Sequence, residues 1–181
     1  MNNKIIAFIG ASALVGIVAV PVLSATSTAV SATVTPGVIS VLMNTTSIGY
    51  GTVEIPSVDR VPTDPSADKI IGATNNGGIP EDFFISGADA TGASQNWTIV
   101  DGAPSGASTY DYNHKFLDCD NDSACTNPAT ANSMTTTAEA LATGVSVNAT
   151  EYFKLRLSTP TETGGDLSEH STTVTVLATA S

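Results

Sequence analysis

Short stretches of the chain alternate between apolar and polar residues, which is the pattern of β-strands with one buried face. Residues 151–158 are the clearest case, because Phe153, Leu155 and Leu157 would share one face of a strand. Residues 109–118 alternate in the same way over most of their length. Both stretches therefore predict strands rather than helices.

Turn-forming residues separate such stretches at roughly every ten positions, a spacing that is typical of β-sandwich domains. The predicted strands are residues 33–43, 46–55, 69–73, 81–86, 96–100, 109–118, 137–141, 151–158 and 170–178. Residues 138–142 are the one patch with helix preference, so a single helical turn is the alternative there. Residues 56–67 are expected to form a loop, and residues 119–133 an irregular insertion.

The strongest local signal is Asn76-Gly77, which lies between two β-favouring runs. Asn-Gly favours the positive φ angles of a type I′ turn, so it predicts a hairpin that joins residues 69–73 to residues 81–86. Residues 96–100 follow as a third strand and carry the only tryptophan. We expect these three strands to form the middle of an antiparallel sandwich.

Two segments resemble a known family of domains. Residues 47–53 read SIGYGTV, and residues 73–83 read ATNNGGIPEDF. They are similar to the S-I-x-F-G-x-V and N-x-G-x-x-P-x-x-F patterns of prokaryotic immunoglobulin-like sandwich domains related to the abnormal-spindle and choice-of-anchor groups. The resemblance implies an immunoglobulin-like fold and a structural or adhesive role at a cell surface, without indicating an activity. This chain holds one such domain, whereas these domains usually occur in long multidomain proteins.

Residues 1–32 have the organisation of a secretory signal peptide. Lys4 precedes an uncharged apolar run at residues 5–23, and small residues follow this run. That order predicts cleavage after Ala32, or alternatively after Ala29. The apolar run is also long enough to span a membrane, so a retained anchor is the alternative to cleavage.

The remaining chain, residues 33–181, has a length typical of one domain. It is rich in β-branched and small residues, which favours an all-β, single immunoglobulin-like sandwich; disorder is the alternative for so polar a chain. The formal net charge of the full sequence is −11. So acidic a chain excludes nucleic acid as a partner and disfavours anionic lipid, so we expect membrane contact only during export. It suits a secreted protein of the cell surface.

Cys119 and Cys125 are the only cysteines, and an even number in an exported chain predicts one disulfide. Free thiols or a metal site are the alternatives. Asp118, Asp120 and Asp122 have the D-x-D-x-D spacing of calcium loops, which makes calcium the one candidate cofactor. The other residues of an EF-hand loop are missing, so the alternative is an exposed acidic loop that binds no metal.

Aromatic residues and sequons are the remaining candidate binding features. Trp97, Tyr110 and Tyr112 are candidates for an exposed platform that binds a sugar, and the alternative is that they fill the core. Asn44 and Asn148 begin Asn-x-Ser/Thr sequons in predicted turns, so they are the candidate glycosylation sites.

No catalytic motif is present and only two histidines occur, so we expect no enzymatic activity. The first functional hypothesis is a secreted structural surface protein, a filament or sheath subunit that assembles with copies of itself or with other surface proteins. Residues 33–43, apolar on both faces, would be donated as a strand to a neighbouring copy. The alternative is a monomeric adhesion or carbohydrate-binding module with glycans as partners.

Overall fold

The computed structural model describes residues 36–105, 110–162 and 168–181. The predicted signal peptide, residues 1–32, lies outside the described residues, as do the first three residues of the predicted strand at 33–43. Pro36–Ser181 forms one compact unit. Nowhere in the described ranges is there a helix with the length and apolar character needed to cross a membrane.

All regular elements in the described part of the chain are β-strands, as the alternation predicted. The strands are β1 (Val41–Met43), β2 (Ile70–Asn75), β3 (Glu81–Ser86), β4 (Thr98–Ile99), β5 (Asp111–Asp118), β6 (Asn132–Ser133), β7 (Glu139–Val145), β8 (Thr150–Ser158) and β9 (Thr175–Ala180). Most of the patch with helix preference lies in β7, so the helical turn considered there does not form.

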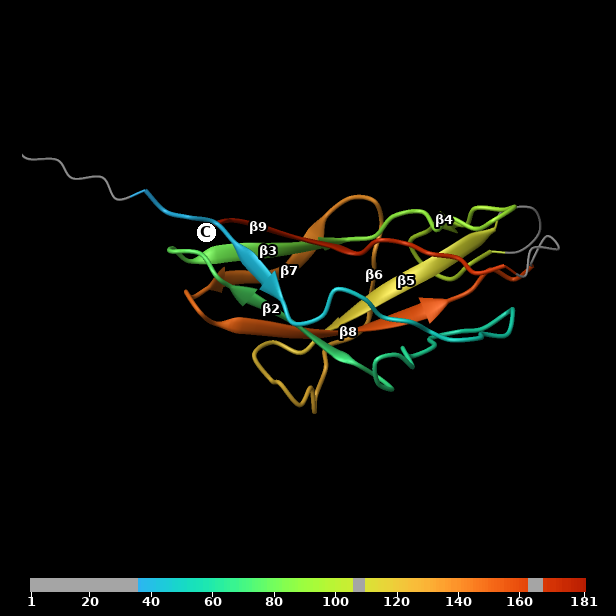
Figure 1. The fold of residues 1–181 in the computed structure, drawn as a ribbon, viewed down its shortest axis with the longest axis horizontal. Coiled ribbons are helices and arrows are strands. Elements are labelled where there is room, and N and C mark those ends of the chain that lie inside the picture. The colour runs from blue at the N-terminus through green and yellow to red at the C-terminus, as the bar shows by residue number, and fades with distance from the viewer. Residues whose placement is uncertain (1–35, 106–109, 163–167) are drawn as a thin grey trace, which may run out of the picture. The chain divides into compact units, whose positions relative to one another are not determined.

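The strands form two sheets (Figure 1). The first has the order β1-β2-β8-β5-β4, with β6 paired to β5, and the second has the order β7-β3-β9. Neighbouring strands are antiparallel with one exception, because β4 runs parallel to β5. The expectation of antiparallel pairing throughout is therefore wrong at this pair, where Thr98 lies opposite Asp111 and both strands begin at the same end.

Both sheets contribute side chains to one core. Phe83 and Ile85 of β3 are fully buried, and their neighbours along the strand are half-buried, as expected for a strand with one face in the core. Phe153 and Leu155 of β8 and Phe116 of β5 enter the same core from the other sheet. Two sheets that share a core in this way are consistent with the predicted β-sandwich.

The predicted hairpin between β2 and β3 does not form, because the two strands belong to different sheets. Neither Asn76 nor Gly77 has the positive φ of a type I′ turn. The buried Asn75 side chain instead organises the crossing: its Nδ2 donates to the carbonyl oxygens of Ile79 and Val145, each at 2.8 Å, and its Oδ1 accepts from the Gly77 amide at 2.8 Å. These bonds satisfy backbone groups at the point where the chain crosses from one sheet to the other.

The predicted strand at residues 46–55 is also not found. The segment makes one isolated antiparallel bridge, between Gly49 and Asp64. Gly51 has a φ of 66°, which interrupts an extended strand. Ile48 and Ile55 still pack against the core, so the segment covers part of the core without forming a strand of either sheet.

The segment expected to be donated to another copy pairs within its own chain. Val41–Met43 forms β1, which is antiparallel to β2. Backbone bonds extend this pairing at both ends, since the Gly78 amide donates to Val38 O at 2.8 Å and the Asn44 amide donates to Gly72 O at 3.0 Å. This segment is therefore an edge strand of the first sheet.

Candidate functional site

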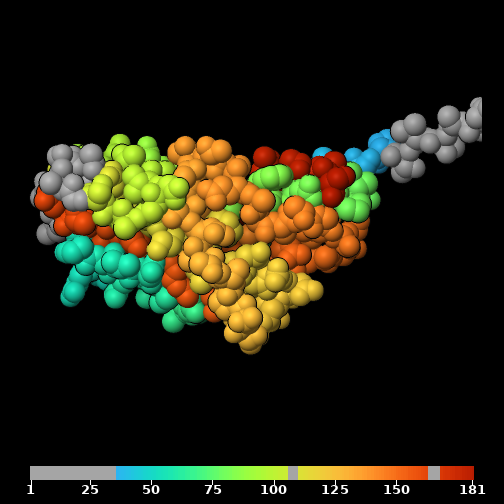
Figure 2. Space-filling model, turned by 180° about the vertical axis from the view of Figure 1, so that it is seen from behind, coloured from blue at the N-terminus to red at the C-terminus, as the bar shows by residue number. Residues whose placement is uncertain are grey.

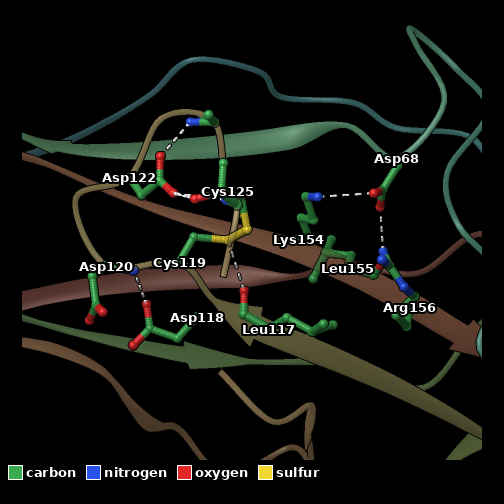
Figure 3. The surroundings of a disulfide bond; sticks show 12 residues. Asp68, Leu117, Asp118, Cys119, Asp120, Asp122, Cys125, Lys154, Leu155 and Arg156 are labelled. Atoms are coloured by element: carbon green, nitrogen blue, oxygen red, sulfur yellow. Dashed lines mark hydrogen bonds and ion pairs between the residues drawn. A yellow bond between two sulfur atoms is a disulfide. The ribbon is translucent and has the colours of Figure 1, made fainter. Parts of the chain in front are cut away.

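The insertion after β5 is closed by a disulfide between Cys119 and Cys125, as predicted (Figure 3). Both cysteines are buried, while the insertion itself protrudes as a yellow to orange projection in Figure 2. Asp122 shapes the loop: its carboxylate accepts hydrogen bonds from the Ala124 amide at 2.9 Å, the Thr126 amide at 2.8 Å and the Thr126 hydroxyl at 2.6 Å. These bonds, the Thr126 hydroxyl first, lower the pKa of Asp122 to about 2.

The three candidate calcium ligands do not converge. Asp122 is directed to the amides of its own loop, whereas Asp118 Oδ1 accepts from the Asp120 amide at 2.8 Å (Figure 3). Across the described ranges, no three His, Cys, Asp or Glu side chains form a group that could hold a metal ion. The D-x-D-x-D spacing builds Asx-type turns here, because a carboxylate readily accepts from the amide two residues further on.

Asp118 and Asp120 lie instead beside Glu151, around a shallow depression of about 330 Å³. Burial raises the pKa of Asp118. Burial, together with the charges of Asp118 and Asp120, raises the pKa of Glu151. The cluster makes this end of β8 an acidic surface.

Asp68 attaches the 56–68 loop to the outer side of β8. Its carboxylate forms ion pairs with Lys154 at 3.0 Å and with Arg156 at 2.6 Å (Figure 3). Burial opposes ionisation of Asp68, but the hydrogen bonds and positive charges of the two cations outweigh it and lower its pKa. The two cations that alternate with the buried residues of β8 therefore share one carboxylate.

The described residues also border an open groove of about 1100 Å³. Residues 45–53 line one side and residues 168–174 line the other. Core residues of β2, β5 and β8 form part of its lining, including Ile71, His114 and Leu155. We call it the edge groove.

A row of aromatic rings extends across this region. Trp97 stacks on His170 with ring centroids 3.9 Å apart and an interplanar angle of 17°. Tyr112 lies 6.2 Å from Trp97, His114 lies 6.4 Å from Tyr112, and Tyr50 lies 5.7 Å from His114. Tyr50, Trp97, His114 and His170 line the edge groove, and the row connects its two sides.

The predicted sugar platform of Trp97, Tyr110 and Tyr112 is not exposed. Tyr112 is completely buried and Trp97 is 8% exposed. Tyr110 is half-buried and packs against the core. The alternative made from the sequence, that these rings fill the core, is the arrangement observed for Trp97 and Tyr112.

His114 and Tyr50 form a neutral pair in the wall of the edge groove. The Tyr50 hydroxyl lies 2.7 Å from His114 Nε2. Burial lowers the pKa of His114 to about 4 and raises the pKa of Tyr50. Both groups are therefore uncharged at neutral pH, and the pairing joins residues 64 positions apart, which no local sequence pattern could have indicated.

Two buried polar atoms at the edge groove lack a partner. They are Nδ1 of His114 and Nε1 of Trp97, neither of which has a hydrogen-bond partner among the residues that the structure describes. Tyr112, by contrast, is satisfied by Ala88 O and by the Thr172 hydroxyl. Unpartnered buried groups are uncommon in folded proteins and call for a physical explanation.

The two candidate glycosylation sites lie on exposed turns. Asn44 directly follows β1, and Asn148 lies in the turn between β7 and β8 with a φ of 65°. Both side chains are accessible, and their modification stays a prediction.

Comparison of the chain with protein-family models, with curated proteins and with solved structures finds no match. The resemblance to immunoglobulin-like domains therefore stays a prediction from two sequence segments. Function has to be inferred from the exposed edges, the edge groove and the sequence signals for export.

Proposed function

We propose that the protein is a secreted, non-catalytic structural protein of the cell surface whose copies associate through the edge formed by β1 and β9. The position of the exposed apolar side chains supports this proposal. Of the seven large hydrophobic residues exposed in the described ranges, four lie in β1, in β9 or in the segment just before β1: Val38, Ile39, Leu42 and Leu177. Apolar side chains gathered on one surface favour association with another protein.

The two strands concerned are edge strands of different sheets. β1 ends the first sheet, β9 ends the second, and the two contact each other. An edge strand presents backbone amides and carbonyls that a further strand can pair with. Natural proteins usually protect such edges with lysine or other charged residues, or with proline. β1 reads VLM and β9 reads TVLATA, so neither contains these protecting residues.

Export rests on three sequence and structural features. Residues 1–32 have the order of a signal peptide, and the chain carries a net charge of −11. The disulfide between Cys119 and Cys125 is of a kind that persists in oxidising compartments outside the cytosol. Together with the two sheets and their common core, these features support a secreted immunoglobulin-like sandwich of a cell surface.

Assembly by strand donation would require the copies to exchange β1. Because Val41–Met43 pair with β2 of their own chain, a donated strand would have to leave this position in one copy and occupy it in the next. Addition of strands at the β1 and β9 edge needs no such rearrangement. We therefore propose strand addition as the first mode and exchange of β1 as the second.

The test is negative-stain microscopy and sedimentation velocity of the chain from Thr33. We expect concentration-dependent oligomers or filaments, which Leu42→Lys together with Leu177→Lys should abolish. Val58→Lys is the matched control, since Val58 is 72% exposed but lies in the 56–68 loop. Monomers at all concentrations, or equal loss of assembly with Val58→Lys, would contradict the proposal.

A monomeric adhesion or carbohydrate-binding module is the second candidate function. The edge groove favours it, because a concave site lined by aromatic and hydroxyl side chains is of the kind that binds ligands. A protein that stays monomeric and binds a glycan would support this second function over the first.

A further inference from the structure

We propose that Glu81 controls the release of residues 37–43, the β1 segment, and that a released segment takes the same position on a second copy of this chain. The inference rests on the proposed function, because it concerns the association of copies through β1. It goes beyond that function by naming the residue that decides whether β1 stays on its own chain or exchanges.

Glu81 joins the β1 segment to the second sheet. It lies in β3, the middle strand of that sheet, and it is completely buried. Its Oε1 accepts a hydrogen bond at 2.8 Å from the amide of Ser40, the residue directly before β1. The β1 segment is therefore held by this carboxyl group as well as by its backbone pairing with β2.

The burial of this carboxyl group opposes the attachment. Glu81 Oε2 is buried and has no hydrogen-bond partner among the residues that the structure describes. None of the ion pairs in the described ranges involves Glu81. A buried carboxyl oxygen without a partner is less stable than one in water. Departure of the β1 segment, whose amide contacts the group, would open this site to water and relieve that penalty.

The residues just before β1 are held by few other contacts. Val38 is 63% exposed and Ile39 is 47% exposed, so their apolar side chains are poorly buried. Val38 O and Ser40 O accept from the amides of Gly78 and Asn76, each at 2.8 Å. Without the bond to Glu81, mainly these backbone bonds would remain, and segments held in this way open locally before the core does.

The close fit of the β1 segment points to a second copy as its new partner. A β-carbon on Gly77 would overlap Val38 O and Glu81 Oε1. A β-carbon on Gly37 would overlap the Ile79 side chain. The segment thus fits against the chain between β2 and β3 because both positions are glycine. A second copy presents the same glycine, the same carboxyl group and the same β2 edge, so an exchanged segment would form identical bonds, as in domain swapping.

The first test is amide hydrogen exchange of the chain from Thr33. The amides of Asn76 and Gly78 donate to the β1 segment, so their exchange reports its release. Glu81→Ala should speed their exchange at least about tenfold, the size expected for one lost hydrogen bond to a carboxyl group. Glu81→Gln keeps an acceptor oxygen and should restore exchange close to that of the parent.

Asp82→Ala is the matched control. Asp82 is the next residue of β3, and its carboxylate accepts from the Gly144 amide at 2.7 Å rather than from the β1 segment. It should leave the Asn76 and Gly78 amides unchanged. The buried Met134 amide, which donates to His114 O, reports on the core and should be unaffected by Glu81→Ala.

Two outcomes would overturn the control by Glu81. One is unchanged exchange of the Asn76 and Gly78 amides in Glu81→Ala, and the other is equal acceleration of the Met134 amide. If Glu81→Ala does not fold, Ser40→Pro removes the donor of the same bond at a sheet edge, where proline is tolerated. Unchanged exchange of the Gly78 amide in Ser40→Pro would then overturn the proposal.

Sedimentation velocity separates this inference from the proposed function. Glu81→Ala should form oligomers several-fold faster than the parent, because exchange requires release of the β1 segment. Assembly of both at the same rate would overturn this inference alone and leave strand addition as the mode of association. Faster amide exchange without assembly of either protein would refute the structural function and the second copy as partner, while the release controlled by Glu81 would stand.

Discussion

Replacing Asn75 with alanine should remove three hydrogen bonds at the point where the chain crosses from one sheet to the other. Asn75 is completely buried, and its amide bonds to Ile79 O, Val145 O and the Gly77 amide, each at 2.8 Å. The variant would leave two carbonyls and one amide without their partner. One of these carbonyls belongs to Val145, which is itself buried, so water cannot readily replace the lost bond.

The expected loss of stability follows from these bonds. Each contributes about 1 kcal/mol net, and stranded buried groups cost more, so Asn75→Ala should lower the free energy of unfolding by about 3–4 kcal/mol. That is a large part of the roughly 5–15 kcal/mol that is typical of whole domains. Urea unfolding, followed by the fluorescence of Trp97, would measure the change.

Asn76→Ala is the matched control for this prediction. Asn76 is exposed, and its substitution should change stability by less than about 0.5 kcal/mol. A type I′ hairpin would give the opposite order, since Asn76 would then occupy a position with positive φ. A loss below about 1 kcal/mol for Asn75→Ala, or an equal loss for Asn76→Ala, would refute the crossing described here.

Three further predictions concern protonation, the disulfide and an ion-pair cluster. Burial lowers the pKa of His114 from its ordinary value of 6.5 to about 4; the unfolded chain therefore binds this proton more readily. Stability should decline as the pH falls from 6.5 towards 4, by up to about 3 kcal/mol in urea unfolding at stepped pH, and a decline unchanged by His114→Phe would contradict this cause. Replacing Cys119 and Cys125 with serine should cost about 2 kcal/mol, because the bridge closes a short loop. Reductant should destabilise the parent similarly and leave the double variant unaffected; an equal effect on both would argue against the bridge. Asp68→Asn should lower the melting temperature, with a cost of about 1 kcal/mol that shrinks at high salt. Asp59→Asn, which breaks a single exposed pair, should cost less, and the reverse order would refute the assignment.

The strands of this protein were largely readable from the sequence. β3 has the predicted boundaries, and β8 differs from its predicted range by one residue. Phe83, Phe153 and Leu155 are buried as the alternation indicated. This agreement has a simple cause: the period of two is local, and it specifies which face of a strand is apolar without reference to any other strand.

The partners of those strands were not readable in the same way. The Asn-Gly signal indicated a hairpin, but Asn75 forms a hydrogen bond with Val145, 70 positions away, and this bond helps take the chain to the other sheet. A turn preference is worth little against several buried hydrogen bonds, so tertiary contacts override it. The strand expected at residues 46–55 fails for a related reason, since Gly51 and the packing of Ile48 against the core hold the segment outside the ladder.

The sequence by itself determined the all-β character of the chain, its acidic surface, the pairing of its two cysteines and the faces of its main strands, because composition and local period encode these properties. Only the tertiary structure decided which strands neighbour one another and how the edge groove is assembled. Tyr50 and His114 meet across 64 positions, and Trp97 stacks on a histidine 73 positions later. Such contacts depend on how two sheets pack, and no local pattern of residues carries that information.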